Sequence, residues 1–224
     1  FVKNSKNLSL KCLSVHIGSQ ILDHRPYEKM LSVLDRIIKR SNYNFEYIDL
    51  GGGMGIDYAN NNEKLNLKKY SLSIEKFLKK NPCKIIFEPG RSIVGDTGIL
   101  ITKILYIKKG YKKDFIILDA GMNDLMRPAL YGAEHRIIPT KRKKAMSKKT
   151  YEFVGPICES TDKFASIKKF QELDEKEFLI ICDVGAYGTS LSSNYNLRPK
   201  PIELLIKNSK IQIINKRQKL SELM

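Results

Sequence analysis

Tryptophan is absent from this sequence, and cysteine is scarce. The cysteines form no CxxC pair and have no regular spacing, which argues against a disulfide scaffold or a zinc ribbon and favours a reducing, cytoplasmic compartment. They are Cys12, Cys83, Cys158 and Cys182. No window approaches about 18 uninterrupted apolar residues, so a membrane-spanning helix is not expected. The chain starts at Phe1 without a basic-then-apolar leader, which is typical of a fragment rather than of a secreted precursor.

The 224 residues suffice for one large domain or two small ones. Hydrophobic residues make up 42% and charged residues 29%, the composition of a folded globular protein. The net charge of +16 invites a nucleic-acid interpretation. However, most lysines are scattered doublets, and the one dense cluster, residues 141–149, has no aromatic side chain for base stacking. We therefore favour a solvated loop there and expect neither nucleic acid nor membrane as a partner. A basic nucleic-acid binder stays the weaker alternative, and it would show steeply salt-dependent DNA binding at this cluster.

The first part of the chain alternates between strand and helix patterns. Apolar, β-branched runs predict three strands, and apolar residues at helical spacing predict two helices between them. The strands are predicted at residues 8–17, 45–50 and 85–87, and the helices at 26–40 and 70–78. Strands that alternate with helices indicate a parallel sheet covered by helices.

The pattern changes near residues 95–98, where we place a boundary between domains 1–97 and 98–224. Beyond it, short apolar runs with period-two alternation predict further strands, and one short helix is predicted at residues 161–170. The strands are predicted at residues 99–108, 115–118, 151–154, 178–182 and 202–206. The second part is therefore interpreted as an antiparallel β-sandwich or β-barrel domain.

Three junctions that follow strands of the first part carry residues suited to ligand binding, at 16–20, 51–55 and 88–91. In parallel α/β folds, ligands bind at this carboxyl edge of the sheet. Three consecutive glycines let backbone N–H groups approach an anion closely, so phosphate binding is favoured over a plain turn that needs positive φ. The dinucleotide fingerprint Gly-x-Gly-x-x-Gly is not met.

Two further side chains at these junctions are ambiguous when taken alone. Glu88 ends a strand and is expected to be buried, either in a site or in a salt-bridged turn. His16 would more often be a core histidine. In the second part, the candidates lie in loops rich in glycine and proline, and each alone is weak. They are Arg127, Tyr131, Cys158, Glu159 and Tyr187.

Taken in order, these segments resemble the fold-type III, alanine-racemase-like, pyridoxal-phosphate-dependent decarboxylases, and within them the branch that acts on diaminopimelate. The resemblance covers nearly the whole chain. It rests on HIGSQ at 16–20, DLGGGMGIDY at 49–58, EPGRSIVGDTGIL at 88–100, DAGMNDLMRPALYGAEH at 119–135, VGPICESTD at 154–162 and CDVGAYGTSLSSNYNLRPKP at 182–201. Cys158 is followed by Glu159 and Ser160, whereas ornithine decarboxylases would be expected to show Asp there.

The resemblance implies a pyridoxal 5′-phosphate site and no metal. His16 would stack on the pyridine ring. Glu88 would pair with the ring nitrogen and keep it protonated, which makes the cofactor a better electron sink. Tyr187 would contact cofactor and substrate from the second part. The cofactor phosphate would be held by Ser19, Gly52, Gly53 and the backbone of Glu88, Pro89, Gly90 and Arg91.

The resemblance also implies a substrate site for meso-2,6-diaminopimelate, which would be converted to L-lysine and CO₂ in lysine biosynthesis. Arg91, Arg127 and Tyr131 would bind a substrate carboxylate, since Arg offers a fork that fits it. Glu159 would meet the distal ammonium, and Cys158 would return a proton to the substrate carbon after decarboxylation.

One part of the family pattern is missing. The lysine that binds the cofactor covalently belongs to a YAxKAN-like strand near the start of the barrel, and this sequence lacks that segment. A full barrel takes about 250 residues. We therefore expect the C-terminal part of a (β/α)8 TIM-type barrel followed by the β domain, inactive alone, from a homodimeric parent whose active sites are shared between subunits. The alternatives are a related decarboxylase for ornithine, arginine or carboxynorspermidine, and a catalytically inactive binding or regulatory relic.

Overall fold

The computed structural model of this chain describes residue 2 and residues 5–224. The chain divides into two compact units, the first ending at Gly95 and the second beginning at Asp96. Each unit has a hydrophobic core of its own. The units are therefore described one at a time.

The first unit is built on a three-stranded parallel sheet in the order β1-β2-β3. Its strands are Cys12–Ser14 (β1), Tyr47–Asp49 (β2) and Lys84–Ile86 (β3). Pairing covers only three residues of each strand, so β1 and β2 are shorter than the predicted runs. The three strands are in register, because Ser14 pairs with Asp49 and Asp49 with Ile86. The chain thus leaves all three strands at the same edge of the sheet.

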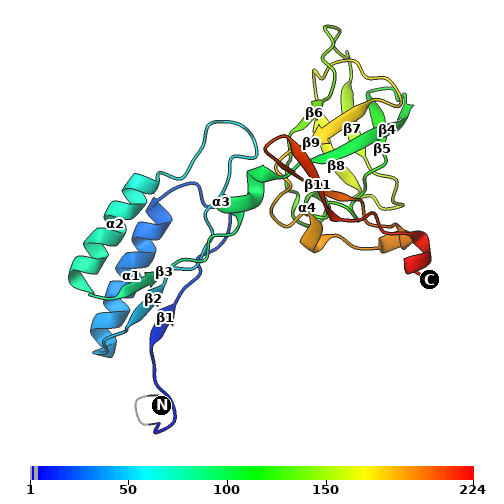
Figure 1. Cartoon of the computed structure of the whole chain (residues 1–224). Coiled ribbons are helices and arrows are strands. Elements are labelled where there is room, and N and C mark those ends of the chain that lie inside the picture. The colour runs from blue at the N-terminus through cyan, green and yellow to red at the C-terminus, as the bar shows by residue number, and fades with distance from the viewer. Residues whose placement is uncertain (1, 3–4) are drawn as a thin grey trace. The chain divides into compact units, whose positions relative to one another are not determined.

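Two helices, α1 (Arg25–Ser41) and α2 (Leu67–Lys80), lie side by side on one face of this sheet (Figure 1). Both were predicted from their helical spacing. Their apolar faces are buried in one core with Ile48 and Leu50, which are fully buried. The first unit therefore has the strand–helix–strand–helix–strand order that the sequence predicts.

The second unit contains a six-stranded sheet in the order β6-β9-β4-β5-β7-β8. The strands are Leu100–Lys108 (β4), Lys113–Leu118 (β5), Ile137–Pro139 (β6), Thr150–Val154 (β7), Lys163–Ile167 (β8) and Phe178–Ile181 (β9). All neighbouring strands are antiparallel except β5 and β7, which are parallel. The sheet is mixed, so the prediction of an antiparallel domain is wrong at this pair. The long segment between β5 and β7 returns the chain to the same end of the sheet before β7 begins.

Residues 161–170 include strand β8 rather than the predicted helix. Phe164, Ile167 and Phe170 recur every third residue, which imitates helical spacing. In the structure, β8 pairs antiparallel with β7, and Phe164 is buried in the core of the second unit. Pairing with a neighbouring strand and burial therefore outweigh a marginal helical pattern.

A buried carboxylate lies on β7, the strand next to the edge strand β8 of this sheet. Glu152 on β7 pairs with Lys113 of β5 and, at 3.4 Å, with Lys163 of β8. Burial alone raises the pKa of Glu152, but the hydrogen bonds and charges of the two lysines outweigh it, so the net pKa is lowered. Glu152 is thus ionised, and its two ion pairs link β7 to the strands on either side, β5 and β8.

The remaining elements are short. They are the antiparallel hairpin Glu203–Lys207 (β10) and Lys210–Asn215 (β11), the helices Arg91–Val94 (α3) and Arg127–Tyr131 (α4), and the 3-10 turns Gly95–Thr97, Thr189–Leu191, Tyr195–Leu197 and Leu220–Glu222. Residues 141–149 form a loop between β6 and β7, as predicted. Two of its lysines make ion pairs: Lys143 with Asp174 at 2.8 Å and Lys149 with Asp114 at 3.4 Å.

Candidate functional site

The three predicted junctions of the first unit meet at the carboxyl edge of the β1–β3 sheet. The Gly52 N–H lies 3.4 Å from Nδ1 of His16, which connects the second junction to the first. The Glu88 N–H donates to the Gly51 carbonyl at 2.9 Å, which connects the third to the second. The in-register parallel sheet is the reason these segments converge.

The three glycines of residues 51–53 are required by close approach between these loops. A Cβ on Gly52 would collide with the carbonyl oxygen of Glu88, and a Cβ on Gly53 with that of Gly18. Gly51 and Gly53 also have φ angles of 66° and 88°, a region that L side chains rarely adopt. The turn geometry and the loop packing both require glycine. Because these residues have no side chains, their own backbone N–H groups are not covered by a Cβ.

Beside this loop, a guanidinium and a hydroxyl are held together. Arg91 Nη2 donates to Ser19 Oγ at 3.2 Å, and Arg91 Nη1 donates to the Tyr58 hydroxyl at 2.5 Å. The guanidinium carbon lies 5.6 Å from the centre of the Tyr58 ring. The sequence analysis did not single out Tyr58, although it lies within the segment DLGGGMGIDY. A guanidinium and a hydroxyl at this spacing suit a phosphate or a carboxylate.

His16 and Glu88 are both exposed at the same edge. The prediction that Glu88 is buried is therefore wrong for this chain. β3 is an outer strand of its sheet, and its neighbours Ile86 and Phe87 are 39% and 42% exposed.

The first unit fits the cofactor that the resemblance implies. The Ser19 hydroxyl, the Arg91 guanidinium and the bare glycine backbone are suited to a phosphate. An imidazole, His16, and a carboxylate, Glu88, project from the same edge and are suited to a protonated aromatic ring. The donor set therefore matches both ends of pyridoxal phosphate.

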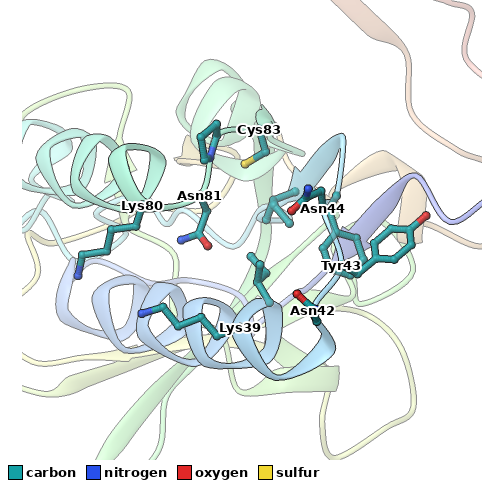
Figure 2. Close-up of a pocket in the computed structure, with 11 residues that line it drawn as sticks. Lys39, Asn42, Tyr43, Asn44, Lys80, Asn81 and Cys83 are labelled. Carbon is teal, nitrogen blue, oxygen red and sulfur yellow. The ribbon is translucent and has the colours of Figure 1, made fainter.

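A pocket of the first unit lies at the opposite edge of the sheet (Figure 2). Its lining comes from the C-terminal ends of α1 and α2 and from the segments that precede β2 and β3. Residues labelled there include Lys39, Asn42, Lys80, Asn81 and Cys83. Burial raises the pKa of Cys83, so its reactive thiolate form is disfavoured. We do not place the site in this pocket, because the predicted residues lie at the carboxyl edge.

In the second unit, Asp162 orders the loop that carries Cys158. Its carboxylate accepts hydrogen bonds from the backbone N–H groups of Met122 and Ile157, each at 2.7 Å. A Cβ on Gly155 would collide with this carboxylate, so glycine is required there. Burial raises the pKa of Asp162. Cys158 is exposed on the resulting loop.

Tyr195 and Arg198, which the sequence analysis did not single out, donate hydrogen bonds to Glu159 and to Asn123. The Tyr195 hydroxyl donates to Glu159 Oε1 at 2.5 Å, and this hydrogen bond raises the pKa of Tyr195. Arg198 Nε donates to Asn123 Oδ1 at 3.1 Å. Both lie within the segment of residues 182–201, but their partners are 36 and 75 positions away. Spacing along the chain could not reveal such pairs.

The other predicted residues lie elsewhere in the second unit. Arg127 begins α4 and is buried, whereas Tyr131 ends α4 and is 68% exposed. Arg127 contacts His135, and Tyr187 is exposed with a φ of 60°. The structure thus brings Glu159 together with Tyr195, and Arg127 together with His135.

The described residues contain no group of three or more His, Cys, Asp or Glu side chains that could hold a metal ion. Over the same part of the chain, none of the helices has the length and apolar character needed to cross a membrane.

The fold and these motifs define a class of protein. The family described as "Pyridoxal-dependent decarboxylase, C-terminal sheet domain" matches residues 19–185. The chain therefore belongs to the pyridoxal-dependent decarboxylase family, as the resemblance implied.

Within this family the chain is similar to diaminopimelate decarboxylases. It is 40% identical to that of Aquifex aeolicus over 222 aligned positions, with 97% of this chain and 52% of the relative covered. It is 41% identical to that of Helicobacter pylori over 228 aligned positions, with 100% of this chain and 56% of the relative covered. The crystal structure of the H. pylori enzyme complexed with L-lysine matches 99% of this chain and 55% of that chain, with a TM-score of 0.90 and 40% identity. The chain thus spans about half the length of the curated relatives it matches.

Proposed function

We propose that this chain is the C-terminal part of an enzyme that decarboxylates meso-2,6-diaminopimelate to L-lysine and CO₂. One observation carries the proposal: 99% of the chain matches a diaminopimelate decarboxylase complexed with L-lysine, at a TM-score of 0.90. The exposed loop that carries Cys158 and Glu159 also supports it, because Asp162 accepts a hydrogen bond from the Ile157 N–H of this loop.

The first unit would hold pyridoxal phosphate at the carboxyl edge of its sheet. When bound, the cofactor supplies an electron sink for the carbon that loses CO₂. Ser19, Gly52, Gly53 and the backbone of residues 88–91 hold the phosphate. His16 stacks on the ring, and Glu88 keeps a proton on the ring nitrogen.

The second unit would recognise the substrate and complete the proton transfer. Arg127 and Tyr131, together with Arg91 of the first unit, bind a carboxylate. Glu159 pairs with the distal ammonium, while Tyr187 contacts cofactor and substrate. Cys158 gives its Sγ proton to the substrate carbon after CO₂ has left.

In this proposal, residues 1–97 are the last part of a (β/α)8 barrel, and a longer chain supplies the other strands together with the lysine that binds the cofactor covalently. Residues 98–224 are the β domain. The complete protein acts in the cytoplasm as a homodimer whose sites combine residues of both subunits.

The test is a substrate panel on the full-length protein that ends with this chain. We expect CO₂ release from meso-diaminopimelate and much slower release from ornithine, arginine and carboxynorspermidine. Glu159→Ala would leave the distal ammonium of the bound substrate without its carboxylate partner, so it should lower kcat/KM for diaminopimelate by about a hundredfold or more. Glu172→Ala is the matched control, because Glu172 is an exposed glutamate of the same unit.

A preference for ornithine, arginine or carboxynorspermidine would assign the protein to a related decarboxylase. No turnover of any of these substrates would support the inactive relic. An unchanged kcat/KM in Glu159→Ala would remove Glu159 from the substrate site.

A further inference from the structure

His135 lies in a buried chain of hydrogen bonds between α4 and β9. Its Nε2 is 2.8 Å from Nη1 of Arg127, and its Nδ1 is 2.9 Å from the carbonyl oxygen of Cys182. Arg127 is 6% exposed and His135 is 5% exposed. The imidazole therefore bridges the first residue of a short helix and the end of a strand.

The two neighbours determine which nitrogen of His135 carries the proton. A guanidinium can only donate hydrogen bonds, and a carbonyl oxygen can only accept them. Both contacts are hydrogen bonds only if Nδ1 carries the hydrogen and Nε2 presents its lone pair. The ring is therefore neutral, and its acceptor faces Arg127.

The carbonyl end of this chain is firmly anchored. Ile181, the last residue of β9, pairs with Leu100 of β4 and with Ile137 of β6. The Cys182 N–H donates to the Arg136 carbonyl at 2.9 Å. His135 is thus held to the paired end of β9, whereas α4, which carries Arg127, has only five residues.

We propose that His135 is a positioning residue that fixes the Arg127 guanidinium for a substrate carboxylate. This inference rests on the proposed function, in which Arg127 binds that carboxylate. An arginine fork pairs with a carboxylate in two parallel hydrogen bonds only when its plane is correctly oriented. By accepting one N–H, His135 sets that plane before the substrate arrives, so less ordering is left for the binding step.

The first test uses the 224-residue chain and needs no activity. The chain has three histidines, at positions 16, 24 and 135, so a long-range ¹H–¹⁵N spectrum of the labelled chain contains three imidazole signal sets. His135→Gln identifies the signals of His135 by their loss. We expect the neutral ring with its proton on Nδ1 at pH 7. A proton on Nε2, or a doubly protonated ring, would overturn the proposal.

The second test compares two variants of the full-length protein. His135→Gln and His135→Phe both lose the hydrogen bond to Cys182, but only Gln offers an oxygen that can accept from Arg127. We expect His135→Phe to raise KM for diaminopimelate about tenfold with kcat within about threefold, as expected when binding alone is lost. KM of His135→Gln should stay within about threefold of wild type. His24→Phe, at the start of α1, is the matched control.

If His135→Phe leaves KM unchanged, the proposal is wrong. It is also wrong if KM rises while kcat and thermal stability fall together in both variants, since a purely structural role would give that result. If the wild-type protein releases no CO₂ from diaminopimelate, the proposed function fails, and the spectrum of the chain still decides whether His135 holds Arg127.

Discussion

A single hydroxyl, that of Tyr195, restrains the carboxylate proposed to recognise the substrate ammonium. The Tyr195 hydroxyl donates to Oε1 of Glu159, and this hydrogen bond raises the pKa of Tyr195 above the ordinary tyrosine value. Tyr195→Phe should lower kcat/KM for diaminopimelate by roughly three- to tenfold, the effect of losing about one ordinary hydrogen bond at an exposed side chain. The measurement is steady-state decarboxylation by the full-length protein.

Tyr111→Phe is the matched control for this prediction, because the Tyr111 side chain is 95% exposed. The control should match the wild-type protein. Equal kcat/KM values for Tyr195→Phe and Tyr111→Phe would mean that the hydroxyl does not orient Glu159.

The residues that the sequence predicted differ in a physical way from those that only the structure brings into view. Cys158 and Arg91 lie inside short contiguous motifs, and their predicted roles come from the resemblance that those motifs carry. Tyr58 and Tyr195 contact partners that are 33 and 36 positions away, and the role proposed for His135 depends on which ring nitrogen carries the proton. These properties depend on the tertiary fold, which no local pattern records.

Among the elements, β7 offers a direct test of electrostatics through Glu152. The lowered pKa of Glu152 means that the folded chain stabilises the ionised carboxylate more than the unfolded chain does. The stabilisation is therefore present above the ordinary glutamate pKa of about 4.3 and is lost as the pH falls through the lowered folded value. Thermal unfolding between pH 7 and pH 3 should show Glu152→Gln less stable than wild type at pH 7, with the difference shrinking below about pH 4.3.

Glu175→Gln, in the same unit, controls for the removal of an exposed acid. A Glu152→Gln deficit that stayed constant down to pH 3 would show that the lost contact is not ionic.

The elements also show how far a sequence pattern extends. The α1 and α2 helices and strands β2 and β3 follow from periodicity because each buries one face in the first core. The pattern fails at β8, where apolar residues at every third position lie in a strand and its flanks rather than in a helix. It also fails at β5 and β7, whose parallel pairing depends on the route of the intervening chain. Apolar patterns show which residues are buried but not which strand lies beside them.

For the whole molecule, the shared-site proposal predicts complementation between inactive subunits. One full-length variant lacks the lysine that binds the cofactor, and the other carries Cys158→Ala. Mixed dimers would contain one intact site of two, so statistical exchange should restore roughly a quarter of wild-type activity, by counting in a closed dimer. Activity is measured after subunit exchange.

Two results would contradict this arrangement. A Cys158→Ala variant that is active on its own would mean that the Cys158 thiol has no catalytic role. A mixture no more active than the average of its parts would place Cys158 and the lysine in the same subunit's site.

The order of strands in the second unit has a consequence for its synthesis. β4 lies between β5 and β9, and β5 follows it directly, but β9 starts about 70 residues after β4 ends. At about 5–20 residues per second, a ribosome needs roughly 4 to 14 seconds to produce that stretch. During this interval one edge of β4 has no partner, and an unpaired edge is a template for wrong strand pairing. Translation speed between β4 and β9 therefore sets how long the nascent chain stays open to misfolding, and codons that slow this stretch prolong the exposure.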